Sequence, residues 1–139
     1  MAMLPAMQRN AKVNVLIVDN DDWILWKFQQ LLENAGFNTS ATWSGHEALG
    51  LLRSGVFDVL LVDDYLPDLH SHDFLERVNG LPIQPSIVVM HGDAAKPDDL
   101  QRYESLGVSE LVEKRDPVRV CQAVSFCCAE QPLAGKRVN

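Results

Sequence analysis

Two acidic residues and one lysine stand directly after apolar segments, where their side chains could meet. Asp19 follows the apolar run 13–18, Asp63 closes the run 58–63, and Lys114 follows a shorter run. If the two longer runs form neighbouring strands, the carboxylates converge and repel by roughly 4 kcal/mol at about 4 Å in an effective dielectric near 20. A divalent cation relieves that repulsion, and oxygen ligands favour Mg²⁺ over zinc. Carboxylates, a hard cation and a lysine together form a site for a phosphoryl group, with one aspartate as a possible nucleophile.

Each of these acids taken alone has a simpler interpretation as a solvated residue at a strand end or helix cap. For a single aspartate that interpretation is favoured. Three charged residues that all stand at the ends of predicted strands are much harder to explain in this way, so the pattern favours a phosphoryl-binding site.

The elements that must position these residues alternate along the chain, because each apolar run is followed by a segment of helical periodicity. Two of the helix starts are marked by local motifs. One is Ser44-Gly45-His46-Glu47, which has the form of a capping box, and the other is Asp116-Pro117. The predicted strands are 13–18, 37–42, 58–63, 86–90 and 109–113, and the predicted helices are about 23–35, 44–53, 71–79, 97–106 and 117–128.

Strict alternation of strands and helices predicts an α/β fold, a doubly wound five-stranded parallel sheet with helices on both faces. The continuous apolar runs agree, since central parallel strands are buried on both faces. In such a sheet the site lies beyond the carboxyl ends of the strands, which is where Asp19, Asp63 and Lys114 stand.

The chain has three tryptophans, which are Trp23, Trp26 and Trp43. Inward packing is the default expectation for aromatic side chains. Trp26 is the exception, because it lies off the helix face formed by Ile24, Phe28 and Leu31. We expect Trp26 to be exposed as a contact for a partner.

The composition limits the class of protein. The length of 139 residues fits one domain that buries roughly two thirds of its unfolded surface. A net charge of −7 argues against direct binding to nucleic acid or to a membrane surface. No apolar run approaches the roughly 20 residues of a membrane-spanning helix, and no secretory signal opens the chain. Three cysteines, an odd number, fit neither a disulfide framework nor a zinc site, so we expect a cytoplasmic protein.

Four motifs in order carry a family resemblance. They are LIVDNDD at 16–22, GHEAL at 45–49, FDVLLVDDYLP at 57–67 and GVSELVEK at 107–114. Together they resemble the receiver domain of bacterial two-component response regulators. The resemblance implies a flavodoxin-like sheet with strand order 2-1-3-4-5. It divides the chain into an N-terminal extension (1–12), a receiver domain (13–128) and a flexible C-terminal tail or linker start (129–139).

The resemblance also implies roles for individual residues. Asp63, with Pro67 four residues later, matches the pattern whose aspartate accepts a phosphoryl group from a histidine kinase. Asp19 matches the first member of the family's acidic pair, which holds Mg²⁺, and Lys114 matches the lysine that contacts the phosphoryl group. Tyr65 occupies the place where a backbone carbonyl completes the Mg²⁺ shell.

Several positions depart from the family pattern. Asn20 stands where a second acid binds the metal, and its amide oxygen brings no charge, so Mg²⁺ binding is expected to be weak. Met90 stands where the family carries a hydroxyl, although a register shift of one would put His91 there instead. His91 could also crowd the site. Leu111 replaces the aromatic residue whose rotamer reports phosphorylation, and Arg115 replaces a proline.

The leading interpretation is a phosphoacceptor signalling domain, not an enzyme, served by a histidine kinase or phosphotransfer protein and acting on an unidentified downstream protein. The altered positions support an alternative, an atypical receiver that acts as a phosphorylation-independent interaction module. A small phosphatase or flavin-binding domain fits less well, because 63–65 reads Asp-Asp-Tyr and 19–22 is acidic. A homodimer is left open.

Overall fold

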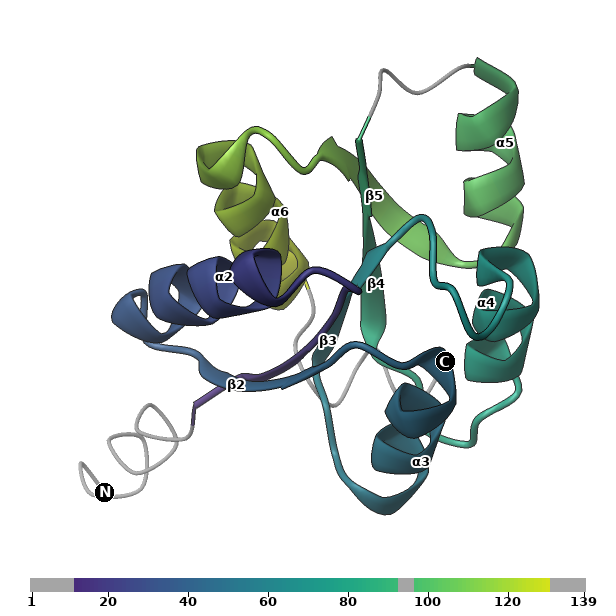
Figure 1. Cartoon of the computed structure of the whole chain (residues 1–139), viewed down its shortest axis with the longest axis horizontal. Coiled ribbons are helices and arrows are strands. Elements are labelled where there is room, and N and C mark those ends of the chain that lie inside the picture. Colours follow the sequence, from purple (N-terminus) through teal and green to yellow (C-terminus); the bar gives the residue numbers. More distant parts are fainter. Residues whose placement is uncertain (1–11, 93–96, 131–139) are drawn as a thin grey trace.

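The computed structural model describes residues 12–92 and 97–130, and within them five strands alternate with five helices (Figure 1). The strands are β1 (Asn14–Val18), β2 (Asn38–Thr42), β3 (Val59–Asp63), β4 (Ser86–His91) and β5 (Val108–Glu113). The helices are α2 (Asp22–Asn34), α3 (Gly45–Ser54), α4 (Ser71–Asn79), α5 (Pro97–Ser105) and α6 (Pro117–Glu130).

Every predicted element is present, and no predicted end differs from the observed one by more than two residues. Helix α6 continues to Glu130, beyond its predicted end at 128. Most of the predicted N-terminal extension (1–12) and C-terminal tail (129–139) lies outside the described residues. No helix in the described part of the chain is long and apolar enough to cross a membrane.

The strands form one parallel sheet in the order β2-β1-β3-β4-β5, so the predicted α/β fold and its strand order are confirmed. β3 and β4 are buried along their whole length, whereas the edge strand β2 is half-polar and partly exposed. This difference in burial between the central strands and the edge strand follows from the sequence, because apolar runs without polar alternation are stable only where helices cover both faces of the sheet.

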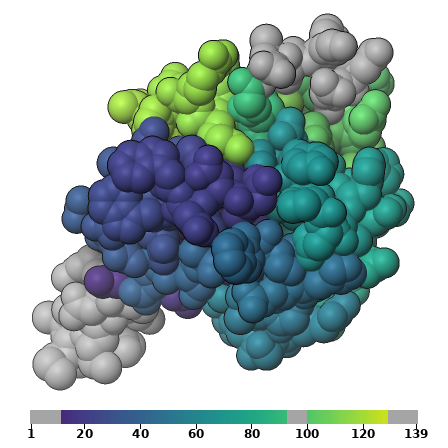
Figure 2. Space-filling view, in the orientation of Figure 1, coloured from purple at the N-terminus to yellow at the C-terminus, as the bar shows by residue number. Residues whose placement is uncertain are grey.

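The alternation of side chains along each strand builds two apolar cores. Ile17 and Leu61 belong to the core beneath α2 and α6, which we call the α2–α6 face. Leu16 and Leu60 belong to the core beneath α3, α4 and α5. Figure 1 shows these two groups of helices on opposite sides of the sheet, and Figure 2 shows the purple surface of α2 next to the green surface of α6.

Helix α2 packs one position away from the expected face. Its buried residues are Leu25, Phe28 and Leu32, whereas the predicted face was Ile24, Phe28 and Leu31. Leu31 is 37% exposed. Both sets have nearly helical spacing, so the direction from which the sheet approaches the helix decides between them.

All three tryptophans are exposed, with exposed fractions of 62% for Trp23, 53% for Trp26 and 60% for Trp43. The exposure predicted for Trp26 is confirmed, but inward packing is wrong for Trp23 and Trp43. Leucine and phenylalanine side chains already fill the core face of α2, and Trp43 lies in the connection between β2 and α3. The indole rings of Trp23 and Trp26 stack, with centroids 5.2 Å apart and planes at 25°.

Polar caps begin the helices at the carboxyl end of the sheet. The Asp21 side chain accepts from the amides of Trp23 and Ile24 at the start of α2. The Ser44 hydroxyl accepts from the Glu47 amide, 3.0 Å away, at the start of α3. The reciprocal half of the predicted capping box is not formed, because the Glu47 carboxylate accepts from the hydroxyl of Thr42 rather than from the Ser44 amide.

Candidate functional site

The two predicted carboxylates lie side by side at the carboxyl ends of neighbouring strands. Val18 of β1 pairs with Val62 of β3, so Asp19 and Asp63 are the next residues along the two strands. Period-two alternation puts both side chains on the α2–α6 face. Asp19 is 0% exposed and Asp63 is 5% exposed. The structure therefore brings together two acids that are 44 positions apart in the sequence and withdraws both from water.

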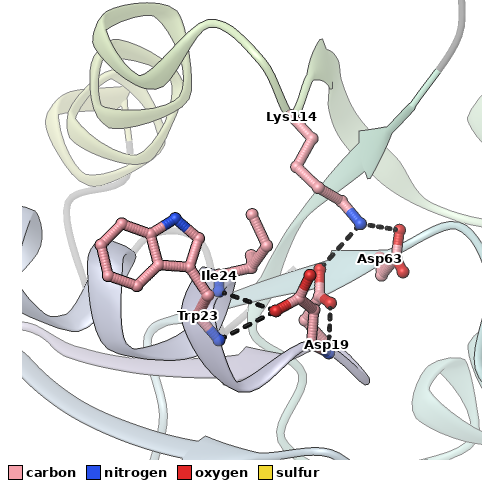
Figure 3. A network of polar contacts seen from close by, with 6 residues as sticks. Asp19, Trp23, Ile24, Asp63 and Lys114 are labelled. Atoms are coloured by element: carbon pink, nitrogen blue, oxygen red, sulfur yellow. Dashed lines mark hydrogen bonds and ion pairs between the residues drawn. The ribbon is translucent and has the colours of Figure 1, made fainter.

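Lys114 completes the cluster from the end of β5. Its ammonium Nζ lies 3.0 Å from Oδ2 of Asp19 and 2.9 Å from Oδ1 of Asp63, and Figure 3 shows it reaching between the two carboxylates. Its own backbone amide donates to the carbonyl of His91, 2.9 Å away, which continues the pairing of β4 with β5. The predicted convergence of Asp19, Asp63 and Lys114 is observed.

Burial and charge shift the pKa values of all three groups. Burial raises the pKa of Asp19 and of Asp63 above the usual 3.8, and the nearby Lys114 only partly opposes this. For Lys114, burial alone would lower the pKa, but the bonds to both carboxylates outweigh it and raise the pKa above 10.5. The cluster holds two acids and one base, so its carboxylates have capacity for a second cation.

The donor set fits a hard cation. Within the described residues the buried Oδ2 of Asp19 has no partner besides the Lys114 ammonium. The other oxygen, Oδ1, accepts from the Asp21 amide at 2.9 Å, which fixes the orientation of the carboxylate. This second contact was not foreseen, although an acid two residues before a helix cap is a recognisable signal for it.

The remaining predicted metal ligands bring no charge. Asn20 and Tyr65 are both exposed and lie in the loops that follow β1 and β3. No group of three or more His, Cys, Asp or Glu side chains in the described part of the chain is arranged to hold a metal ion. The Asp64 carboxylate lies close enough to Asp63 to raise the pKa of that residue further, but the predicted ligands Asn20 and Tyr65 add only neutral oxygens. This set suits weak binding of Mg²⁺ better than tight binding.

Comparison with known proteins identifies the family. The sequence model of the response regulator receiver domain matches residues 15–125. The chain belongs to the response regulator receiver family. As a receiver domain it acts in two-component phosphorelay signalling, and receiver domains generally bind Mg²⁺ at their phosphorylation site.

Two curated relatives of this chain are much longer proteins. It is 32% identical over 124 residues to the transcriptional regulatory protein ZraR of Salmonella typhimurium, covering 89% of this chain and 28% of that protein. It is 29% identical over 112 residues to the two-component response regulator ARR2 of Arabidopsis thaliana, covering 79% of this chain and 16% of that protein. The chain thus spans less than a third of the length of either relative.

Solved structures agree with the fold. A CheY-like receiver domain protein from Methanospirillum hungatei superimposes with a TM-score of 0.77 at 23% identity, covering 86% of this chain and 96% of that one. The receiver domain of a Luxo repressor protein from Vibrio parahaemolyticus superimposes with a TM-score of 0.80 at 17% identity, covering 86% of this chain and 92% of that one. At these identities the likeness establishes the flavodoxin-like architecture of the receiver domain.

The positions that depart from the family pattern can now be placed. Met90 pairs with Asp63 across β3 and β4, is 0% exposed and belongs to the core of the α2–α6 face. A thioether therefore lies level with Asp63, and no register shift brings His91 there. His91 follows Met90 in the strand, so alternation turns it to the opposite face, away from the carboxylates. Leu111 pairs with Val89 and packs, half-buried, against the core beneath α3, α4 and α5.

Proposed function

We propose that Asp63 of this receiver domain accepts a phosphoryl group from a histidine kinase or a phosphotransfer protein. The observation that carries the proposal is the buried cluster of Asp19, Asp63 and Lys114 at the carboxyl edge of the sheet. In the transfer, a carboxylate oxygen of Asp63 forms a bond to phosphorus while the bond between phosphorus and the donor breaks, and the donor leaves with the electron pair.

The neighbouring residues stabilise the charge that this transfer concentrates. Lys114 is 19% exposed and already contacts the Asp63 carboxylate, so its ammonium is placed to follow the phosphoryl oxygens. The carboxylates of Asp19 and Asp63, the Tyr65 carbonyl and, weakly, the Asn20 amide oxygen would hold Mg²⁺. When bound, the ion supplies positive charge that offsets repulsion between the phosphoryl oxygens and the aspartates.

Phosphorylation with a small donor tests the assignment. Incubation with acetyl phosphate and Mg²⁺ should add one phosphoryl mass that is labile to base, and Asp63→Ala should abolish it. Asp73→Asn is the matched control, because it removes one carboxylate charge from an exposed residue in the first turn of α4. An adduct that persists in Asp63→Ala would refute the assignment.

The environment of Met90 and Leu111 favours a second candidate, a receiver domain whose interactions do not depend on phosphorylation. Neither side chain can donate a hydrogen bond to a phosphoryl oxygen, and Met90 is fixed in a core. In that case a phosphoryl mimic should change amide hydrogen exchange over 106–120 little. Strong new protection there would show that another switch exists.

Three further predictions complete the proposal. The downstream partner is a protein rather than nucleic acid, in line with the net charge of −7. The second is a cytoplasmic location, and the third is a homodimer, which the sequence leaves open.

A further inference from the structure

The loop between β3 and α4 is bonded to strand β4 near its beginning and to the start of helix α3 near its end. At its start, the amide of Asp64 donates to the carbonyl of Met90, 2.8 Å away. Four positions later, the Asp68 side chain reaches the start of α3, which is 22 to 24 residues earlier in the chain. The loop thus spans the gap between the phosphoacceptor strand and α3.

Asp68 makes three hydrogen bonds across this gap. Its Oδ1 accepts from the Gly45 amide at 3.0 Å, and its Oδ2 accepts from the His46 amide at 3.1 Å and from the Ser44 hydroxyl at 2.8 Å. Burial acts to raise the pKa of Asp68, but these bonds outweigh it and lower the pKa to about 2. The carboxylate is therefore ionised and bonded throughout the physiological range. We call these three bonds the Asp68 clamp.

The loop also packs tightly against Gly45, the first residue of α3. A Cβ atom added to Gly45 would lie 3.2 Å from both Leu66 Cδ1 and Leu69 Cβ, so the absence of a side chain permits this approach. Leu66 and Leu69 are buried in the core beneath α3, α4 and α5. Because these leucines anchor the loop independently, loss of the clamp should loosen the loop without detaching it.

The clamp adds to the restraints on Tyr65, which lies between the paired amide of Asp64 and the buried side chain of Leu66. Only residues 64–67 separate Asp63, which is fixed in β3, from Asp68, which is fixed on α3. Pro67 also has a restricted φ angle. A segment this short, held at both ends, has few conformations, and Tyr65 lies within it.

From this arrangement we infer that Asp68 is a positioning residue, which holds the Tyr65 carbonyl in place for the cation bound by Asp19 and Asp63. The inference rests on the proposed function, since it concerns the same cation. Groups that orient metal ligands commonly change metal affinity by about 10-fold to 100-fold when they are removed. Asp68 touches neither Asp19 nor Asp63, so it would act only through the loop.

The test is the dissociation constant of Mg²⁺, measured by calorimetry on the full chain. Asp68→Ala should weaken Mg²⁺ binding by about 10-fold, and Asp68→Asn, which keeps one acceptor oxygen, should give a smaller loss. Asp68→Asn also provides a second measurement should Asp68→Ala fold poorly. Asp73→Asn controls for charge, because it removes the same charge from an exposed residue in the first turn of α4.

Asn79→Ala controls for stability. Asn79 donates to the Leu106 carbonyl at the end of α4, at the edge of the sheet opposite the cation site, so its loss should lower the melting temperature without changing Mg²⁺ affinity. Equal affinities in Asp68→Ala and the parent would overturn the inference, and so would equal losses in Asp68→Ala and Asn79→Ala. A parent protein without Mg²⁺ binding would instead refute the proposed cation site itself.

Discussion

Replacing Lys114 by methionine isolates the charge that holds the two carboxylates together. Methionine keeps a long unbranched side chain but removes the ammonium that lies 3.0 Å from Asp19 and 2.9 Å from Asp63. Both carboxylates would stay buried, 0% and 5% exposed, with no cation in contact. The substitution therefore converts two carboxylates bridged by one ammonium into two adjacent anions in a region of low dielectric.

The expected decrease in the free energy of unfolding is large compared with the total stability of a small domain. Removing one partner of a buried ion pair destabilises a protein by about 3–5 kcal/mol. A domain of this size has a total stability of about 5–15 kcal/mol. At roughly 3 °C per kcal/mol, the melting temperature should fall by about 10 °C or more at pH 7 without metal. The loss should shrink in mild acid, because protonation of one carboxylate removes the repulsion.

Urea unfolding in EDTA and in millimolar Mg²⁺ measures both parts of this prediction. Mg²⁺ should stabilise Lys114→Met more than the parent, because the ion no longer competes with an ammonium for the same oxygens. Adding Asp19→Asn to Lys114→Met should recover part of the loss, since only one buried charge remains. The view that Lys114 offsets the charge of the carboxylates would be refuted if Lys114→Met lost less than about 1 kcal/mol of unfolding free energy in EDTA. An equal loss of unfolding free energy with and without Mg²⁺ would refute it as well.

Asn20→Asp should bind Mg²⁺ more tightly, because the ion gains a charged oxygen ligand, and a larger Mg²⁺-dependent rise in melting temperature would show it; an equal rise would mean that Asn20 does not face the metal. In EDTA, the free energy of unfolding should increase as pH falls from 7 towards 3.8, because the folded state raises the pKa of Asp19 and Asp63 and so binds protons more readily than the unfolded chain. The slope of melting temperature against pH should be shallower in Asp19→Asn, and an unchanged slope would contradict the assignment. Gly107→Ala should cost at least about 1 kcal/mol in urea unfolding, because Gly107 has φ +83° and an added Cβ would lie 2.7 Å from Oδ1 of Asn79; a neutral effect would show that α4 can move away.

Most of the fold could be predicted from the sequence because its signals are local. The apolar runs of β1, β3 and β4 have no polar alternation, and only a sheet covered on both faces accommodates them. The positions of Asp19 and Asp63 follow directly, since parallel strands bring their carboxyl ends to one edge.

What the sequence could not supply depends on contacts between distant segments. Ile24 and Leu31 fit a helical stripe as well as Leu25 and Leu32 do, and only the direction of the sheet distinguishes the two sets. Asp68 follows a proline in a loop, and nothing local indicates that its carboxylate caps a helix that begins 23 residues earlier. The position of Met90 relative to His91 likewise needed the register of β3 with β4.

The exposed tryptophans give this domain a built-in optical reporter of its own site. Trp23 and Trp26 stack in the first turns of α2, and the N-cap of that helix is Asp21, whose amide donates to the Asp19 carboxylate. A shift of the Asp19 carboxylate would therefore move the base of the indole pair and alter its emission and its near-ultraviolet dichroism. None of the three tryptophans lies in either core, so the same fluorescence would respond only weakly to the packing of the interior. Intrinsic emission from this protein should follow events at the carboxyl edge of the sheet, while global unfolding should be followed through the backbone.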